Sequence, residues 1–383
     1  MPFLRFNETA LCRTAEKVTG LSDFGDSYFR EGLNHLVDSI ENDAKLHFYG
    51  RLALHRWIIT HLSNRLRLID IQKKKPGIFQ RSIIPPIIIT GLPRSGTTLL
   101  HRLLIADPTH HGVPFWELTR PIPPTQNTRD RRQRMASLEF NLRVKCTHNI
   151  DHIHFIRPEE PEECMWMLGL TFVNLSFWIM APVFSYLDWY MKQNLFHKKY
   201  HDYKALLHVL QATAPNRRLV LKSPEHFARF DVLLKSIPEA MIIQTHRHPV
   251  TVTNSVNSLF YSVHSSMTDR VDRSRLADTN IRLIEHGITH NLIARKKYSG
   301  VVCDVFYKHL MEDPIDVIKT IYNHFSLPWP ENHEQRLVAC IQHNPKDKYG
   351  KHHYMADDFG LTDSRLAPRF REYYEKFGYK YSG

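Results

Sequence analysis

One segment, residues 86–100, restricts the fold more than any other part of the chain. Its sequence is PIIITGLPRSGTTLL, in which a run of β-branched residues ends at Gly91 and a helical pattern begins near Thr97. Gly91 and Gly96 have the GxxxxG spacing of loops that bind phosphate groups between a strand and a helix. Backbone N–H groups of such a loop attract an anion together with the helix N-terminus. The segment therefore predicts a strand–loop–helix unit that binds a phosphate-like group.

The charge of this loop differs from that of nucleotide-hydrolysing enzymes. Those enzymes place Lys directly after the second glycine, on the β- and γ-phosphates, followed by a Ser or Thr that binds Mg²⁺. Here Thr97 follows Gly96, and the positive charge of the loop comes from Arg94. A P-loop nucleotide kinase or NTPase is an alternative, but the loop favours a phosphate-like ligand bound without a triphosphate–metal complex.

Strand and helix patterns alternate along the rest of the chain. RRLVLKSP, AMIIQTHRHP and VVCDVFYKHL each contain a short apolar run, and each is followed by a helical pattern. This alternation predicts an α/β domain with a central parallel sheet. Residues 1–80 are expected to form a helical N-terminal region, and residues 81–383 the α/β domain. Within that domain, residues 120–215 are expected to form an aromatic-rich, mostly helical insertion.

Composition limits the partners without choosing among them. The chain has 51 Lys and Arg against 39 Asp and Glu, a net charge of +12, which favours anionic partners. A basic nucleic-acid-binding protein is the alternative outside enzymes, but the sequence has no basic repeat, zinc finger or aromatic RNA-binding stripe to support it. Five cysteines without a CxxC pair, and a start without a secretory signal, predict a reducing, cytoplasmic location.

Residues 165–187 carry no charged side chain, which is long enough to nominate a membrane span. Gly169, Asn174 and Pro182 interrupt the stretch, and such residues are costly or kinking within a span. We therefore expect a buried or pocket-lining pair of helices here, either as core or as a lid over an apolar ligand.

Two motifs together resemble the family of sulfotransferases that use 3′-phosphoadenosine 5′-phosphosulfate (PAPS). PRSGTTLL is similar to the loop that binds the 5′-phosphosulfate in that family. AMIIQTHRHPVTVTNSV supplies Arg247 and Ser255 at the spacing of the pair that holds the 3′-phosphate. The resemblance covers roughly residues 86–378 and is strongest to the bacterial-type and tyrosylprotein-like members. Further similar motifs are WEL at 116–118, PEEC at 161–164, KSPEH at 222–226 and GKHHY at 350–354.

The resemblance implies a P-loop-like three-layer fold, PAPS as the donor substrate and no metal. Where relatives usually carry Asp after the phosphate-binding arginine, this chain has His248. The positions that it assigns to PAPS binding are Arg94, Ser95, Gly96, Thr97, Thr98, Arg247, Ser255, Lys351 and Tyr354.

Four residues are candidates for the chemistry itself. Sulfuryl transfer passes through a loose, charge-spread transition state, so cationic side chains at Arg94 and Lys222 are suited to stabilise it. Two residues compete as the general base that accepts the proton of the acceptor. Glu117 matches the glutamate of the tyrosylprotein-like members, and the apolar Phe115 and Trp116 would strengthen it as a base. His226 lies four residues after Lys222, whereas cytosolic sulfotransferases place their histidine two residues after the lysine. We favour Glu117.

Other features are less specific. Cys146, His148, His152 and His154 could suggest zinc, but their spacing matches no known site, and we expect no metal. The acceptor is expected to be a small molecule with apolar character that bears a hydroxyl or an amine. The sequence leaves its identity and the oligomeric state open.

Overall fold

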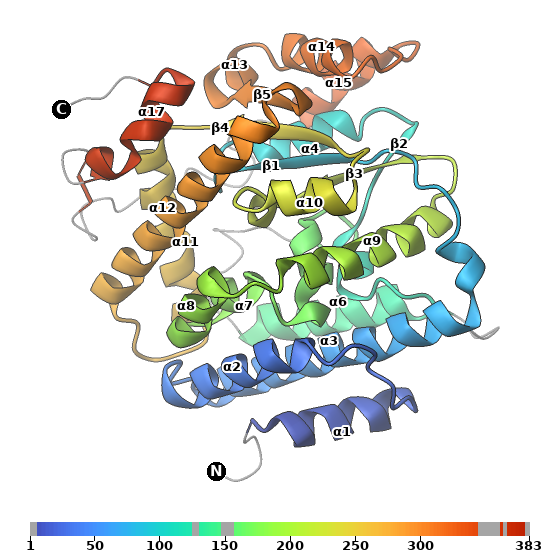
Figure 1. Cartoon of the computed structure of the whole chain (residues 1–383), viewed down its shortest axis with the longest axis vertical. Helices are drawn as coiled ribbons and strands as arrows, with labels where there is room; N and C mark the ends of the chain where they lie inside the picture. The colour runs from blue at the N-terminus through green and yellow to red at the C-terminus, as the bar shows by residue number, and fades with distance from the viewer. Residues whose placement is uncertain (1–5, 125–129, 147–156, 344–360, 363–365, 380–383) are drawn as a thin grey trace. The chain divides into compact units, whose positions relative to one another are not determined.

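The computed structural model describes residues 6–124, 130–146, 157–343, 361–362 and 366–379. The chain divides into two compact units (Figure 1). The first unit comprises Met1–Ile83, Val113–Thr213 and Phe260–Asp272, and the second comprises Ile84–Gly112, Ala214–Leu259 and Arg273–Gly383. Because each unit draws on separate stretches of sequence, each is described by itself.

The first unit is helical. Its N-terminal part consists of α1 (Glu8–Thr19), α2 (Phe29–Asn42) and α3 (Phe48–Lys74), and α1 packs on α3. The side chain of Asn7 caps α1 by accepting a hydrogen bond from the Ala10 amide, and Gly20 ends that helix in the left-handed conformation. Its other elements are α5 (Phe115–Thr119), α6 (Arg132–Cys146), η4 (Cys164–Thr171), α7 (Ser176–Met180), α8 (Phe184–Lys192) and α9 (Phe196–Thr213).

The uncharged stretch at 165–187 lies inside this unit. It forms most of the 3-10 helix η4, all of α7 and the start of α8 rather than a pair of helices, and Asn174 and Pro182 fall in the breaks between these elements. Phe172, Phe177 and Trp178 are completely buried, as the core interpretation predicts; the lid interpretation stays a prediction. Within the described ranges, no helix is both long and apolar enough to cross a membrane.

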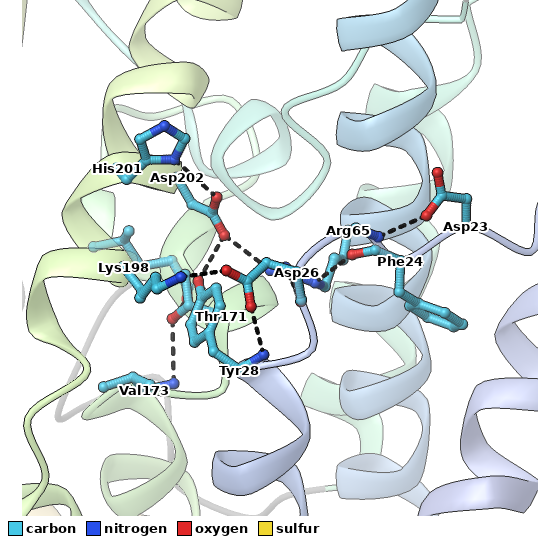
Figure 2. A network of polar contacts seen from close by, with 12 residues as sticks. Asp23, Phe24, Asp26, Tyr28, Arg65, Thr171, Val173, Lys198, His201 and Asp202 are labelled. Atoms are coloured by element: carbon cyan, nitrogen blue, oxygen red, sulfur yellow. Dashed lines mark hydrogen bonds and ion pairs between the residues drawn. The ribbon is translucent and has the colours of Figure 1, made fainter.

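A buried ion pair connects three segments of the first unit (Figure 2). The Arg65 guanidinium, from α3, lies 2.8 Å from the Asp202 carboxylate of α9 and donates to the carbonyls of Phe24 and Asp26 at 2.9 and 2.8 Å. The Tyr28 hydroxyl donates to the same carboxylate at 2.6 Å. Burial, reinforced by Asp202, raises the pKa of Tyr28 well above its usual range. Arg65 therefore fixes the loop before α2 against both α3 and α9.

The second unit contains a five-stranded parallel sheet in the order β2-β3-β1-β4-β5 (Figure 1). The strands are β1 (Ile87–Gly91), β2 (His110–Gly112), β3 (Arg218–Lys222), β4 (Met241–His246) and β5 (Val302–Phe306). The predicted α/β fold with a central parallel sheet is confirmed. The sequence did not predict the short edge strand β2, whose residues HHG have no strand preference.

Helices cover both faces of this sheet. On one face, Ile87, Ile89 and Ile243 form a buried cluster with residues of α4 (Thr97–Leu104) and α14 (Pro314–His324). On the other face, Gln244 bonds to Asn291 of α12 (Arg273–Lys297). Alternate residues of a strand point to opposite faces, so β4 serves both layers. Further elements are η5 (Pro224–His226), α10 (Phe230–Ser236), α11 (Pro249–Ser265), η6 (Ser299–Val301), α13 (Tyr307–Glu312), α15 (His333–His343), η8 (Ala367–Phe370) and α17 (Arg371–Phe377). The last residues of α11, from Phe260 on, are grouped with the first unit.

Candidate functional site

The glycine loop between β1 and α4 has an unusual backbone. Gly91, Arg94 and Gly96 have φ angles of 146°, 64° and 88°, and positive values are rare for a residue with a side chain. A Cβ on Gly91 would lie 2.3 Å from the Thr245 hydroxyl oxygen, so only glycine fits there. The Ser95 hydroxyl is hydrogen-bonded to the same Thr245 hydroxyl at 2.6 Å. Thr245, near the end of β4, thus contacts the loop and stabilises it. The positive φ angle of Arg94 is a strained conformation of the kind found at functional sites.

The second predicted anion motif meets this loop. Arg247 follows β4, and its Nη1 donates to the carbonyl oxygen of Arg94 at 2.7 Å. Ser255, on α11, accepts a hydrogen bond of 3.1 Å from Nε of Arg94. The Arg247 guanidinium carbon also lies 4.2 Å from the ring centre of Tyr307, a cation–π contact. Residues far apart in sequence therefore form one cluster with two guanidinium groups.

Lys222 brings a third cation to the carboxyl edge of the sheet. It ends β3, pairs in register with Ile89 of β1, and is almost completely buried. Its Nζ donates to the Thr98 hydroxyl at 3.4 Å, which places it beside the first turn of α4. His226 lies at the end of η5, with its side chain fully buried.

Glu117, the other candidate base, belongs to the first unit. It lies on α5 with 4% of its surface exposed, and its Oε1 accepts a hydrogen bond of 3.1 Å from the Thr213 hydroxyl. The second unit therefore brings together the predicted site residues Arg94, Ser95, Thr98, Lys222, Arg247 and Ser255. Glu117 belongs to the first unit.

Comparison with known proteins identifies the family of this chain. Residues 85–331 match the profile described as the Sulfotransferase family. The chain belongs to the sulfotransferase family. The omega-hydroxy-beta-dihydromenaquinone-9 sulfotransferases Stf3 of Mycobacterium bovis and Mycobacterium tuberculosis are each 23% identical to it over 364 residues, which cover 86% of this chain and 87% of theirs.

Two crystal structures of mycobacterial sulfotransferases share the fold. STF1 from M. tuberculosis H37Rv is 29% identical, with a TM-score of 0.83 over 96% of this chain and 99% of that one. STF9 from M. avium is 27% identical, with a TM-score of 0.85 over 98% and 97% of the two chains. The predicted membership of the family is confirmed.

Some residues assigned to the sulfotransferase site fall outside the described ranges. These are Lys351 and Tyr354, together with His148, His152 and His154 of the weak zinc hypothesis. Among the residues that the structure describes, no group of three or more His, Cys, Asp or Glu side chains could hold a metal ion.

The structure shows that the residue before Arg247 is held by buried partners that the sequence did not predict. His246 is completely buried, with its two ring nitrogens hydrogen-bonded to the Tyr373 hydroxyl at 2.8 Å and to Asp304 at 2.9 Å. Arg295 lies 2.6 Å from the same carboxylate. Burial lowers the pKa of His246, although Asp304 opposes that shift. The neutral ring then donates from one nitrogen and accepts at the other, which fixes the backbone that carries Arg247. The sequence Thr245-His246-Arg247 alone does not indicate the partners of His246.

Proposed function

We propose that this sulfotransferase moves a sulfuryl group from PAPS to a hydroxyl group on an apolar small molecule. One observation carries the choice of donor: Arg94 contacts both Arg247 and Ser255. PAPS has a phosphosulfate at one end of its ribose and a phosphate at the 3′ position. A glycine loop joined to a second cationic motif is suited to such a pair of anions.

In this proposal, different residues bind different groups of PAPS. The loop residues Ser95, Gly96 and Thr97 would hold the 5′-phosphosulfate with the amides that begin α4. Arg247 and Ser255 would hold the 3′-phosphate. In the transfer, the bond from sulfur to the leaving phosphate oxygen breaks as the bond to the acceptor oxygen forms. Lys222 and Arg94 would neutralise charge on the transferring group and the leaving phosphate.

We further propose Glu117 as the general base and His226 as the alternative. Support for Glu117 comes from the WEL motif and from its burial on α5 beside Phe115, where its carboxylate accepts a hydrogen bond from the Thr213 hydroxyl. His226 shares a unit with Lys222, which is the observation in its favour.

The acceptor class follows from a relative. The Stf3 proteins are named for an omega-hydroxylated dihydromenaquinone, which is an alcohol on an apolar molecule. At 23% identity we extend only that chemical class to this chain. The cysteine pattern supports a cytoplasmic location as part of the proposal.

Nucleotide binding measured by thermal shift tests the donor. Adenosine 3′,5′-bisphosphate without Mg²⁺ should raise the melting temperature, since ligand at about 100 times its Kd adds about 2.7 kcal/mol. ATP, which lacks a 3′-phosphate, should raise it less. Equal shifts, or a need for Mg²⁺, would favour an NTPase, and a response only to oligonucleotides would favour nucleic-acid binding. Transfer of labelled sulfate from PAPS to a panel of apolar alcohols, phenols and amines then identifies the acceptor.

A further inference from the structure

Exposed apolar side chains gather on two helices of the first unit. Among the described residues, ten large apolar side chains are well exposed, and five of these lie on α3 and α6. Tyr49 has 60% of its surface exposed and Phe48 has 53%. Single exposed apolar residues are ordinary, whereas a group of them indicates an interaction surface. The five residues are Phe48, Tyr49, Leu52, Met135 and Leu138.

An ion pair connects the two helices. Nη2 of Arg56, on α3, lies 3.1 Å from Oε1 of Glu139 on α6. Leu52 precedes Arg56 by one helical turn, and Met135 precedes Glu139 by one turn. Leu52 and Met135 therefore lie one turn from the two partners of this ion pair, and we call the five apolar residues with Arg56 the α3–α6 face.

The charges around the α3–α6 face are unbalanced. Two acidic neighbours are engaged by arginines, since Glu41 lies 2.6 Å from Arg51 and Asp130 lies 2.9 Å from Arg132. A third, the exposed Glu159, accepts a hydrogen bond from the Ser137 hydroxyl of α6 at 3.2 Å. Glu139 is shared between Arg56 and Arg120, at 3.1 and 2.8 Å. The exposed basic residues that add positive charge are Lys45, Arg131 and Arg134.

The basic and apolar residues also share a helix face. Arg131 accepts from the Met135 amide through its carbonyl at 2.9 Å, so it stands at the N-terminal boundary of α6. Arg131, Arg134, Met135 and Leu138 follow the i, i+3, i+4, i+7 pattern of one side of a helix. Aromatic and aliphatic side chains bordered by arginine and lysine form the pattern of an interfacial membrane-binding surface.

We propose that the α3–α6 face docks the protein on the surface of an anionic lipid bilayer. Phe48, Tyr49 and Leu52 enter the boundary between headgroups and acyl chains, and the basic residues contact lipid phosphates. The exposed basic residues of this face favour an anionic bilayer over an uncharged protein surface as its partner. An apolar acceptor dissolved in lipid is then reached from the membrane surface. The inference goes beyond the transfer reaction, and its test needs no catalytic activity.

Co-sedimentation of the full chain with vesicles tests the proposal. Vesicles of phosphatidylglycerol and phosphatidylcholine should bind the protein at low salt, more strongly than phosphatidylcholine alone. The double variant Phe48→Ser/Tyr49→Ser should weaken binding on the order of tenfold or more, because the apolar area is lost. The matched control is Ile293→Ser, since Ile293 is 59% exposed on the second unit; it should bind as the wild type does. Arg131→Gln/Arg134→Gln should weaken binding and reduce its dependence on salt.

Two outcomes would overturn the proposal. One is equal binding by the Phe48→Ser/Tyr49→Ser variant and the Ile293→Ser control, or no binding to anionic vesicles at all. The other is a dimer, detected by analytical ultracentrifugation, that the Phe48→Ser/Tyr49→Ser change dissociates, because the face would then join two copies of the chain. Circular dichroism of each variant checks that the fold is intact, and binding of adenosine 3′,5′-bisphosphate reports separately on the proposed function.

Discussion

Two contacts hold the guanidinium group of Arg247: the carbonyl of Arg94 at 2.7 Å and the ring of Tyr307 at 4.2 Å. These contacts orient a fork-shaped cation that would pair with the 3′-phosphate. Arg247→Ala should therefore weaken binding of adenosine 3′,5′-bisphosphate by about 10- to 100-fold, the range of a hydrogen bond to a charged group. Ser255→Ala should cost less, because it removes one neutral hydroxyl.

Calorimetric titration of both variants, with a nucleotide that has a 3′-hydroxyl for comparison, measures the effect. Arg371→Ala is the control, since that side chain is 75% exposed and its ion pair with Glu375 is 3.8 Å long. If both site variants still prefer the 3′-phosphate as strongly as the wild type does, the phosphate is held elsewhere.

The choice between Glu117 and His226 leads to a second prediction at this scale. Glu117→Gln keeps the size of the side chain and its contact with the Thr213 hydroxyl but accepts no proton. Turnover should fall by roughly 10²–10⁴-fold, the usual contribution of a general base, while nucleotide binding is unchanged. His226→Asn should lose less. Steady-state rates for both variants decide the matter, and a nearly inactive histidine variant beside an active Glu117→Gln would reverse the assignment.

Sequence predicted which residues carry charge at the site, but not how they contact one another. The glycine spacing and the Arg247–Ser255 spacing were readable because local backbone geometry requires them. The contact between Arg94 and Ser255 was not, because it depends on how two distant strand ends align in the sheet. Thr245 belongs to the AMIIQTHRHPVTVTNSV motif and Tyr307 to no motif, and the contacts of both with the site depend on the fold.

At the scale of elements, the short apolar runs predicted the central strands most accurately. PPIIITG, RRLVLKSP, AMIIQTHRHP and VVCDVFYKHL each contain a strand that the structure places within a few residues of the expected bounds. These strands are covered on both faces, so their sequences are nearly continuous apolar runs. β2 has three residues at the edge of the sheet and too little apolar character to predict.

The ion pair of Arg65 and Asp202 supports a prediction about how elements are joined. Arg65 has 1% of its side chain exposed and joins its own helix α3 to two other segments, the loop at 24–26 and α9. Asp202→Asn leaves this guanidinium without its counter-charge, so the free energy of unfolding should fall by about 3–5 kcal/mol. The control is Lys308→Met, because Lys308 is 80% exposed and forms only a surface pair with Glu312; it should cost less than about 1 kcal/mol. Urea denaturation measures the free energy of unfolding of both variants. Equal decreases in the two would show that the Arg65–Asp202 pair contributes no more than a surface ion pair.

At the scale of the whole molecule, the chain passes between its two units several times. Residues 1–83 belong with 113–213 and with 260–272. Sequence order does not reveal such grouping, because it depends on which distant helices pack together. The predicted division into residues 1–80 and 81–383 stays a prediction. The family profile begins at residue 85, two residues before β1, the first strand of the sheet.

Two buried histidines of the first unit make stability depend on pH. Burial, with repulsion from Arg120, lowers the pKa of His61 to about 3. Burial also lowers the pKa of His264 to about 4, although its bond to the Trp178 carbonyl acts in the opposite direction. Both pKa values are below the value of 6.5 expected in the unfolded chain. The unfolded state therefore binds more protons as the pH falls below 6.5, and stability is lost between that pH and about 4.

Through most of this window, each histidine should lower the free energy of unfolding by about 1.4 kcal/mol for each unit that the pH falls. Near pH 6 the effect is only partly developed, so the two together should lower that free energy by about 2 kcal/mol between pH 6 and pH 5. Urea denaturation at a series of pH values measures the slope. His264→Gln removes one titrating group and should reduce that slope by about 1 kcal/mol per unit, whatever it does to stability at neutral pH. His343→Gln, at an exposed position on α15, should leave the slope unchanged. A slope that His264→Gln does not alter would mean that His264 takes up its proton in the folded state, and thus that the interior around Trp178 is open to water.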